Sequence, residues 1–174
     1  MGRRKKQKNP LDYISIPRLN ISPDIKRSIW VVFLLALGII SFLSLFELGG
    51  SLGYYLNQAM AWLSGWGSFI IPLLLLFAGW QLYNSEKSEV SGLNYIGMFL
   101  FLWSFQGILQ LFISVDEWDY ALEMGTGGGH IGWTLAAIVI NLFGFWAGLI
   151  IVLALLVIGM MLMFNTNLAT LFKH

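Results

Sequence analysis

Long apolar stretches separated by short polar loops dominate the sequence after residue 28. Three of them have the length of a membrane-spanning helix: residues 29–46, 63–82 and 93–115. Such a helix needs about 20 mainly apolar residues, because the hydrocarbon core of a bilayer is ~30 Å thick and a helix rises ~1.5 Å per residue. The pattern therefore predicts three spans in the first two thirds of the chain.

The last apolar stretch, residues 131–164, is too long for a single crossing. As one straight helix it would measure ~51 Å, against a core of ~30 Å. It is too short, and has too weak a turn signal, for two comfortable crossings. Its natural break is Asn141–Gly144, a polar residue and a glycine in apolar sequence. We expect a membrane-embedded or interfacial segment over residues 131–143 and a fourth span over residues 145–164.

Shorter patterns place the remaining elements. Apolar residues recur at helical spacing from Leu52 to Leu63, which predicts a short helix on the outer membrane surface. Pro72 lies inside the second span, where we expect it to kink the helix. Ser22 followed by Pro23 and Asp24 is typical of a helix start. Residues 1–21 form a basic cytoplasmic tail, and residues 22–172 an all-α polytopic membrane domain with four transmembrane helices and short interfacial or re-entrant helices.

Composition agrees with a membrane protein. The 174 residues are 57% hydrophobic and 11% charged, whereas soluble domains have about 25% charged residues. The absence of cysteine excludes disulfides, thiolate catalysis and cysteine-type zinc sites. The first apolar stretch lacks a small-x-small cleavage site, so we do not expect a cleaved signal peptide.

The positions of the basic residues predict the orientation. Eight of the ten Lys and Arg residues precede the first span, including Lys26 and Arg27. Lys87 lies between the second and third spans, and Lys173 follows the fourth. Because basic residues are retained on the cytoplasmic side, these four should anchor the inner face. Both termini are then inside, which requires an even number of crossings, and four crossings satisfy it.

A glycine-rich turn precedes the embedded segment. Residues 127–132 fit G-x-G-x-x-G literally, but no strand precedes them and a membrane segment follows, so we do not expect a nucleotide site. A tight re-entry turn at the outer interface, where φ must be positive, explains the glycines better. Close helix contact is the alternative, because Gly128 and Gly132, and later Gly144 and Gly148, have GxxxG spacing. The turn comprises Gly125, Gly127, Gly128, Gly129 and Gly132.

The polar candidates within the apolar stretches are Gln106 and Gln110, four apart on one helical face, and Asn141. We expect hydrogen bonds to neighbouring helices, and a substrate path is the alternative. The carboxylates that follow the third span could hold a divalent cation or form a solvated rim. They are Asp116, Glu117, Asp119 and Glu123. No P-loop motif occurs, and His130 is expected to be a hydrogen-bonded surface residue, so no cofactor or metal is predicted.

These features together resemble a known family. A basic tail precedes the first span, a short polar loop separates the second and third, and an acidic-aromatic stretch runs into GGGHIGWTL and then LFGFWAGLIIVLALLVIGMML. The pattern resembles the N-terminal four-helix membrane domain of FtsK/SpoIIIE-type DNA translocases, over about residues 26–171. Its glycines and neighbouring apolar residues carry the resemblance: Gly127, Gly128, Gly129, Ile131, Gly132, Phe143, Gly144, Gly148 and Gly159.

The resemblance implies a bacterial inner-membrane protein at the division septum, which anchors a DNA-pumping ATPase used in chromosome segregation. That motor has no counterpart in these residues, so we expect a fragment that is not an enzyme by itself and meets DNA only through the missing motor. Expected partners are the lipid bilayer, further copies of the chain through Gly144 and Gly148, and other division proteins. A small four-span channel or transporter subunit is the alternative. An intramembrane enzyme ranks last, because no His, Cys or paired carboxylate lies within a span.

Overall fold

The structure is a computed structural model that describes residues 22–84 and 92–165. All regular structure in these two ranges is helical. Four helical stretches are long and apolar enough to cross a membrane: Pro23–Ser44, Gly50–Asn84, Gly92–Leu111 and Gly129–Phe164. The predicted class, an all-α membrane protein with four spans and short additional helices, is confirmed. The basic tail, Lys87 and Lys173 lie outside the described residues.

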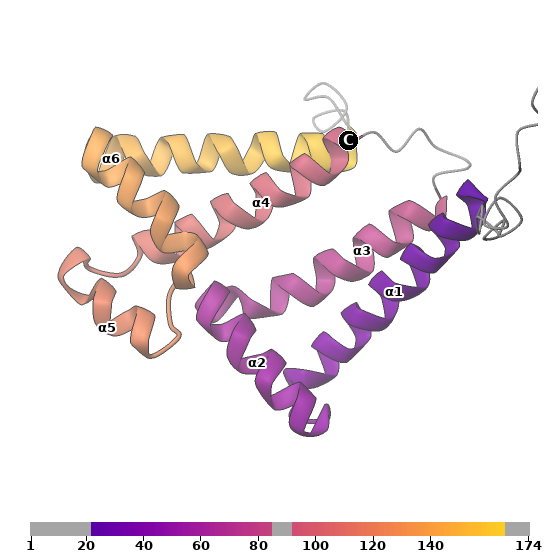
Figure 1. The fold of residues 1–174 in the computed structure, drawn as a ribbon. Helices are drawn as coiled ribbons and strands as arrows, with labels where there is room; N and C mark the ends of the chain where they lie inside the picture. Colours follow the sequence, from indigo (N-terminus) through magenta and orange to yellow (C-terminus); the bar gives the residue numbers. More distant parts are fainter. Residues whose placement is uncertain (1–21, 85–91, 166–174) are drawn as a thin grey trace, which may run out of the picture.

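The helices form two antiparallel hairpins (Figure 1). Hairpin 1 consists of α1 (Pro23–Ser44), α2 (Gly50–Ser64), the short 3-10 helix η2 (Gly65–Phe69) and α3 (Ile70–Asn84). Hairpin 2 consists of α4 (Gly92–Leu111), η3 (Val115–Glu117), α5 (Trp118–Glu123) and α6 (Gly129–Phe164). We call the end where α1 and α4 begin and α3 and α6 finish the terminal end, and the opposite end the loop end.

Reciprocal glycine contacts hold hairpin 1 together. A Cβ atom at Gly38 of α1 would lie 2.9 Å from Cδ2 of Leu76 in α3. A Cβ atom at Gly79 of α3 would lie 2.9 Å from Cδ2 of Leu35 in α1. Small residues of this kind let two membrane helices approach closely, which favours van der Waals packing where lipid supplies no hydrophobic driving force.

Hairpin 2 repeats the arrangement with even closer approach. Gly97 of α4 lies against the backbone of Met163 in α6, with no space for a side chain. A Cβ atom at Gly159 of α6 would lie 2.6 Å from the backbone nitrogen of Phe101 in α4. In both hairpins, glycines of each long helix therefore lie against the facing helix.

Each hairpin has an oblique helical segment at the loop end, which meets its long returning helix at a glycine with positive φ (Figure 1). In hairpin 1, α2 ends at Gly65, whose φ is 51°. In hairpin 2, α6 bends at Gly144, with φ 72° and ψ 178°. The bend at Gly144 falls within the predicted break, Asn141–Gly144.

Hairpin 1 differs from the prediction in two respects. Pro72 does not kink a continuous span, because it lies in the first turn of α3, where backbone N–H groups have no helical acceptor to lose. Leu63, at which the second span was predicted to begin, belongs to α2, and the break follows it at Gly65–Phe69.

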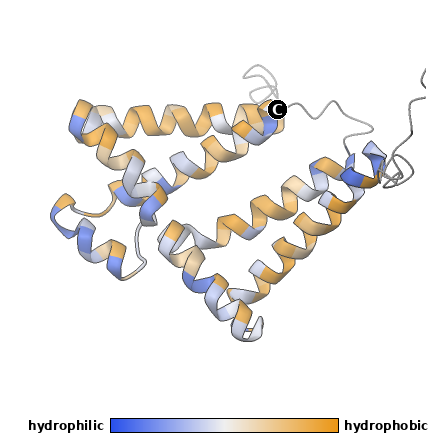
Figure 2. Cartoon of the chain, in the orientation of Figure 1, coloured by the Kyte–Doolittle hydropathy of each residue, from blue (hydrophilic) through white to orange (hydrophobic). Residues whose placement is uncertain are grey.

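Apolar residues run along most of the length of the long helices, and polar residues gather toward the two ends of the bundle (Figure 2). Large apolar side chains point away from the protein, for example Phe33 on α1 and Ile150 on α6, which are 53% and 69% exposed. A bilayer would cover these surfaces. Trp80 and Tyr83, near the end of α3, are exposed at the terminal end, where aromatic side chains anchor helices at an interface.

Candidate functional site: the glycine junction

The two hairpins meet at the loop end in a packed junction of backbone and two glutamines. It is formed by η2, by the turn 125–132 and by the adjoining part of α4, and we call it the glycine junction. Gln106 and Gln110 lie one turn apart on α4, and both side chains are fully buried. The Nε2 atom of Gln106 donates to the carbonyl oxygen of Gly67, at 3.1 Å. The backbone N–H of Gly128 donates to Oε1 of Gln110, at 3.0 Å.

The glutamines therefore connect α4 to both neighbouring segments. Gln106 binds a carbonyl of hairpin 1, and Gln110 binds an amide of the turn in hairpin 2. This is the hydrogen-bonding role expected from their spacing on one helical face. One amide atom of each glutamine, Oε1 of Gln106 and Nε2 of Gln110, is buried without a partner in the structure.

Direct backbone contact completes the junction. The N–H of Trp66 donates to the carbonyl oxygen of Gly127, at 2.9 Å. A Cβ atom at Gly129 would lie 2.6 Å from the backbone nitrogen of Gly65. At Gly67, a side chain would overlap the carboxamide of Gln106. Hairpin 1 thus inserts its glycine-containing break into the glycine-rich turn of hairpin 2.

The glycines of the turn serve two different purposes. Gly125, Gly127 and Gly129 have φ values of 62°, 63° and 58°, a conformation that L residues seldom adopt. Gly128 and Gly132 are not among the positive-φ glycines, but both lie against the backbone carbonyl of Gln106, leaving no space for a side chain. The expected tight turn and the alternative of close helix contact are therefore both present, at different glycines of one motif.

His130 lies at the edge of the junction. Its ring stacks on Trp62 of α2 with centroids 3.9 Å apart, and its Nδ1 atom lies 2.8 Å from the carbonyl oxygen of Trp62. Within the described residues, no three His, Asp or Glu side chains lie where they could hold a metal ion. The carboxylates of the α4–α6 connection, for which a cation site was one option, are not gathered into such a group.

The other intramembrane candidates lie apart from the junction. Asn141 is exposed on α6. A Cβ atom at Gly144 would meet nothing within 4 Å, so this glycine provides the bend and no contact within the chain. Gly148 is buried, and a Cβ atom there would lie 2.7 Å from Cγ1 of Val139 in the same helix. Gly148 thus packs the two arms of α6 together and does not present an open face to a second copy.

Two side-chain amides at the terminal end were not among the residues predicted from the sequence. Gln81 of α3 and Asn94 of α4 both donate to the carbonyl oxygen of Met163, at 2.8 and 3.4 Å. At the same end, the rings of Phe77 in α3 and Phe164 in α6 pack together with centroids 5.4 Å apart. The last turn of α6 is therefore held by both hairpins. The sequence signal that could have identified them is a polar amide residue close to one end of an apolar stretch: Gln81 in residues 63–82 and Asn94 in residues 93–115.

Of the four predicted anchors, Lys26 is exposed and Arg27 links α1 to α3. Arg27 donates from Nε to the carbonyl oxygen of Leu82, at 2.8 Å, and from Nη2 to that of Tyr83, at 2.7 Å. These carbonyls belong to the last turn of α3, where a cation also interacts favourably with the helix dipole. Arg27 is therefore a helix cap as well as a surface charge.

Replacing Arg27 with glutamine should destabilise the domain by about 1–2 kcal/mol, because the variant loses two charge-assisted hydrogen bonds at a helix C-terminus. Thermal unfolding in detergent micelles would measure the loss. The matched control is Lys26→Gln, which removes the neighbouring exposed charge and should change stability by less than about 0.5 kcal/mol. Equal effects of the two substitutions would contradict the capping role.

The fold and the junction define a class: a polytopic helical membrane domain of two glycine-packed hairpins. A family model described as the 4TM region of DNA translocase FtsK/SpoIIIE matches residues 43–174. The match begins at the end of α1 and includes the whole glycine junction. The chain belongs to this family. Searches of curated proteins and of solved structures found no match.

Proposed function

We propose that this chain is the membrane-anchoring, septum-localising and assembly domain of a bacterial cell-division DNA translocase. The observation that carries the proposal is the family match, because membership implies a membrane-anchoring domain of the FtsK/SpoIIIE family. The match identifies the membrane domain alone. On this proposal the chain is not an enzyme by itself, and DNA is handled only by a motor outside these residues.

The geometry supports an anchoring role. The first and last spans, α1 and α6, begin and finish at the same end of the bundle (Figure 1). A motor that followed α6 would therefore lie on the same side of the membrane as the basic tail that precedes α1. The distribution of Lys and Arg favours the cytoplasm for that side. Self-association and contact with other division proteins belong to the same proposal.

The alternative of a channel or transporter has less support. A path around Gln106 and Gln110 would need these side chains to face a cavity. Instead both are fully buried, and each bonds to a backbone group of the glycine junction. The third residue of that hypothesis, Asn141, is exposed. Gln106 and Gln110 are better explained as packing contacts.

The orientation can be tested with single cysteines, because the chain has none of its own. Tyr120 lies at the loop end in α5 and is 66% exposed, whereas Lys26 is exposed at the terminal end. In intact cells, a membrane-impermeant thiol reagent should label Tyr120→Cys, and should label Lys26→Cys only after permeabilisation. The reverse pattern would contradict the proposed orientation.

Localisation needs a separate experiment. A fluorescent fusion of residues 1–174, expressed in dividing bacterial cells, should collect at the division site. The control is a fusion carrying Gly132→Val, which should lose the septal signal because the junction no longer forms. A wild-type fusion spread evenly over the membrane would contradict septal localisation, while leaving the membrane-anchoring role intact.

A further inference from the structure

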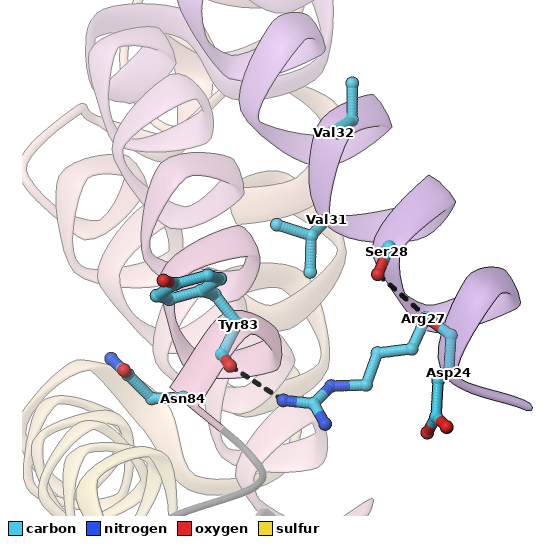
Figure 3. Close-up of a pocket in the computed structure, with 7 residues that line it drawn as sticks. All are labelled: Asp24, Arg27, Ser28, Val31, Val32, Tyr83 and Asn84. Carbon is cyan, nitrogen blue, oxygen red and sulfur yellow. Dashed lines mark hydrogen bonds between the residues drawn. The ribbon is translucent and has the colours of Figure 1, made fainter.

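A pocket of about 330 Å³ lies between α1 and α3 at the terminal end (Figure 3). Charged and polar groups line part of it, and valine side chains line the rest. The lining residues are Asp24, Arg27, Ser28, Val31, Val32, Tyr83 and Asn84. The position is that of lipid headgroups, because α1 begins its crossing here and α3 completes its own.

The pocket carries both signs of charge. Asp24 and Arg27 are three residues apart on α1, so they lie on the same face of the helix, as Figure 3 shows. The guanidinium of Arg27 is held in place by its hydrogen bonds to the carbonyl oxygens of Leu82 and Tyr83. The carboxylate of Asp24 is exposed in the first turn of α1. A ligand here would meet a fixed cation and a carboxylate together.

A shallow, more apolar hollow, lined by residues of α1, continues from this pocket along the outer face of that helix. It shares Asp24, Ser28 and Val32 with the first and is lined further along by apolar side chains: Ile25, Ile29, Phe33 and Ala36. From residue 24 to residue 36 the helix rises ~18 Å, and half of the hydrocarbon core is ~15 Å. The hollow therefore has about the length of one acyl chain in its leaflet.

We propose that these two adjoining hollows bind a zwitterionic phospholipid of the phosphatidylethanolamine kind. Its phosphate would lie beside Arg27, its ammonium group beside Asp24, and one acyl chain along the hollow from Ile25 to Ala36. Charge complementarity selects this headgroup. An anionic phospholipid such as phosphatidylglycerol offers a phosphate to the cation but repels the carboxylate, whereas the zwitterion satisfies both. The site is independent of which side of the membrane the terminal end occupies.

Native mass spectrometry of the purified 174-residue chain would test the preference. The protein is equilibrated with equal amounts of phosphatidylethanolamine and phosphatidylglycerol that have identical acyl chains. We expect about fivefold more retained phosphatidylethanolamine, the factor that one partly exposed charge pair supplies. The variant Asp24→Asn should reduce the ratio to about one, while Asp24→Glu should preserve it. The matched control Lys26→Gln removes a neighbouring charge that lines neither hollow, and should leave the ratio unchanged.

A competition experiment separates the lipid from its headgroup. Soluble glycerophosphoethanolamine has the phosphate and the ammonium group without acyl chains, and should not displace the bound lipid at equal concentration. Displacement would overturn the role of the apolar hollow and assign the pocket to a free phosphoester. Equal retention of the two lipids by the wild-type chain, or an unchanged ratio in Asp24→Asn, would overturn the zwitterionic site.

Discussion

Replacing Gly132 with valine should push α6 off α4 in hairpin 2, disrupt the glycine junction and destabilise the domain by at least ~3 kcal/mol. A Cβ atom at Gly132 would overlap the backbone carbonyl of Gln106. The obstacle is helical backbone and cannot rotate away, so α6 must move off α4. That movement would also weaken the bond between Gly128 and Gln110. Thermal unfolding in detergent would measure the loss of stability.

A distance measurement would show whether the junction itself opens. Spin labels at Tyr54 of α2 and Tyr120 of α5 report on the two hairpins at the loop end, and both positions are well exposed. Their separation should increase in Gly132→Val. The matched control is Gly92→Val, because a Cβ atom at Gly92 meets nothing within 4 Å. Wild-type stability and label separation in Gly132→Val would show that the junction does not depend on this contact.

Local patterns in the sequence predicted the elements well, because they are set by properties that neighbouring residues share. The lengths of the apolar stretches gave four spans, and the polar-glycine break at Asn141–Gly144 contains the observed bend. The glycine-rich turn indicated positive φ, which occurs at three of its residues. Pro72 was misinterpreted because a proline kinks a helix only in its interior, and where α3 begins depends on the break before it.

The contacts between distant segments could not be predicted in the same way. A glycine indicates that something approaches closely, but not which segment approaches. Nothing near Gly67 in the sequence specifies Gln106 as its partner, although their hydrogen bond joins the hairpins. The same holds for Gln81 and Met163, which are 82 positions apart. The candidate residues were therefore identified, while the junction they build emerged only from the fold.

The junction at one end and the amide contacts at the other suggest how the domain keeps its shape in a bilayer. Lipid surrounds both hairpins, so burial of apolar surface does not favour their association. Polar contacts to backbone groups supply the specificity instead, through Gln106 at the loop end and Gln81 at the terminal end. Each fixes one hairpin against the other, and together they set the position at which α6 leaves the membrane.

The bend of α6 leads to the last prediction, that Gly144→Val destabilises the domain by about 1–3 kcal/mol through the backbone alone. A Cβ atom at Gly144 has open space around it, so no steric contact contributes. Its φ of 72° with ψ of 178° is a conformation that only glycine adopts readily. Asn165, at φ 50° and ψ 43°, is in the left-handed helical region that asparagine tolerates. Gly144→Asn should therefore be nearly as damaging as Gly144→Val, whereas Asn165→Gly should be nearly neutral.

The shape of α6 should change along with its stability. Spin labels at Trp133 and Ile158 lie on the two arms of the bend, and both side chains are partly exposed. In a straight helix their backbones would be ~38 Å apart, and the bend makes the wild-type separation shorter. Valine favours the straight helix, so the separation in Gly144→Val should move toward ~38 Å. A straight α6 would be longer than the ~30 Å core. It could not keep Gly132 against Gln106 of α4 and Gly148 against Val139 at the same time. An unchanged separation together with wild-type stability would show that the bend is imposed by the bilayer or by packing, and not by the glycine.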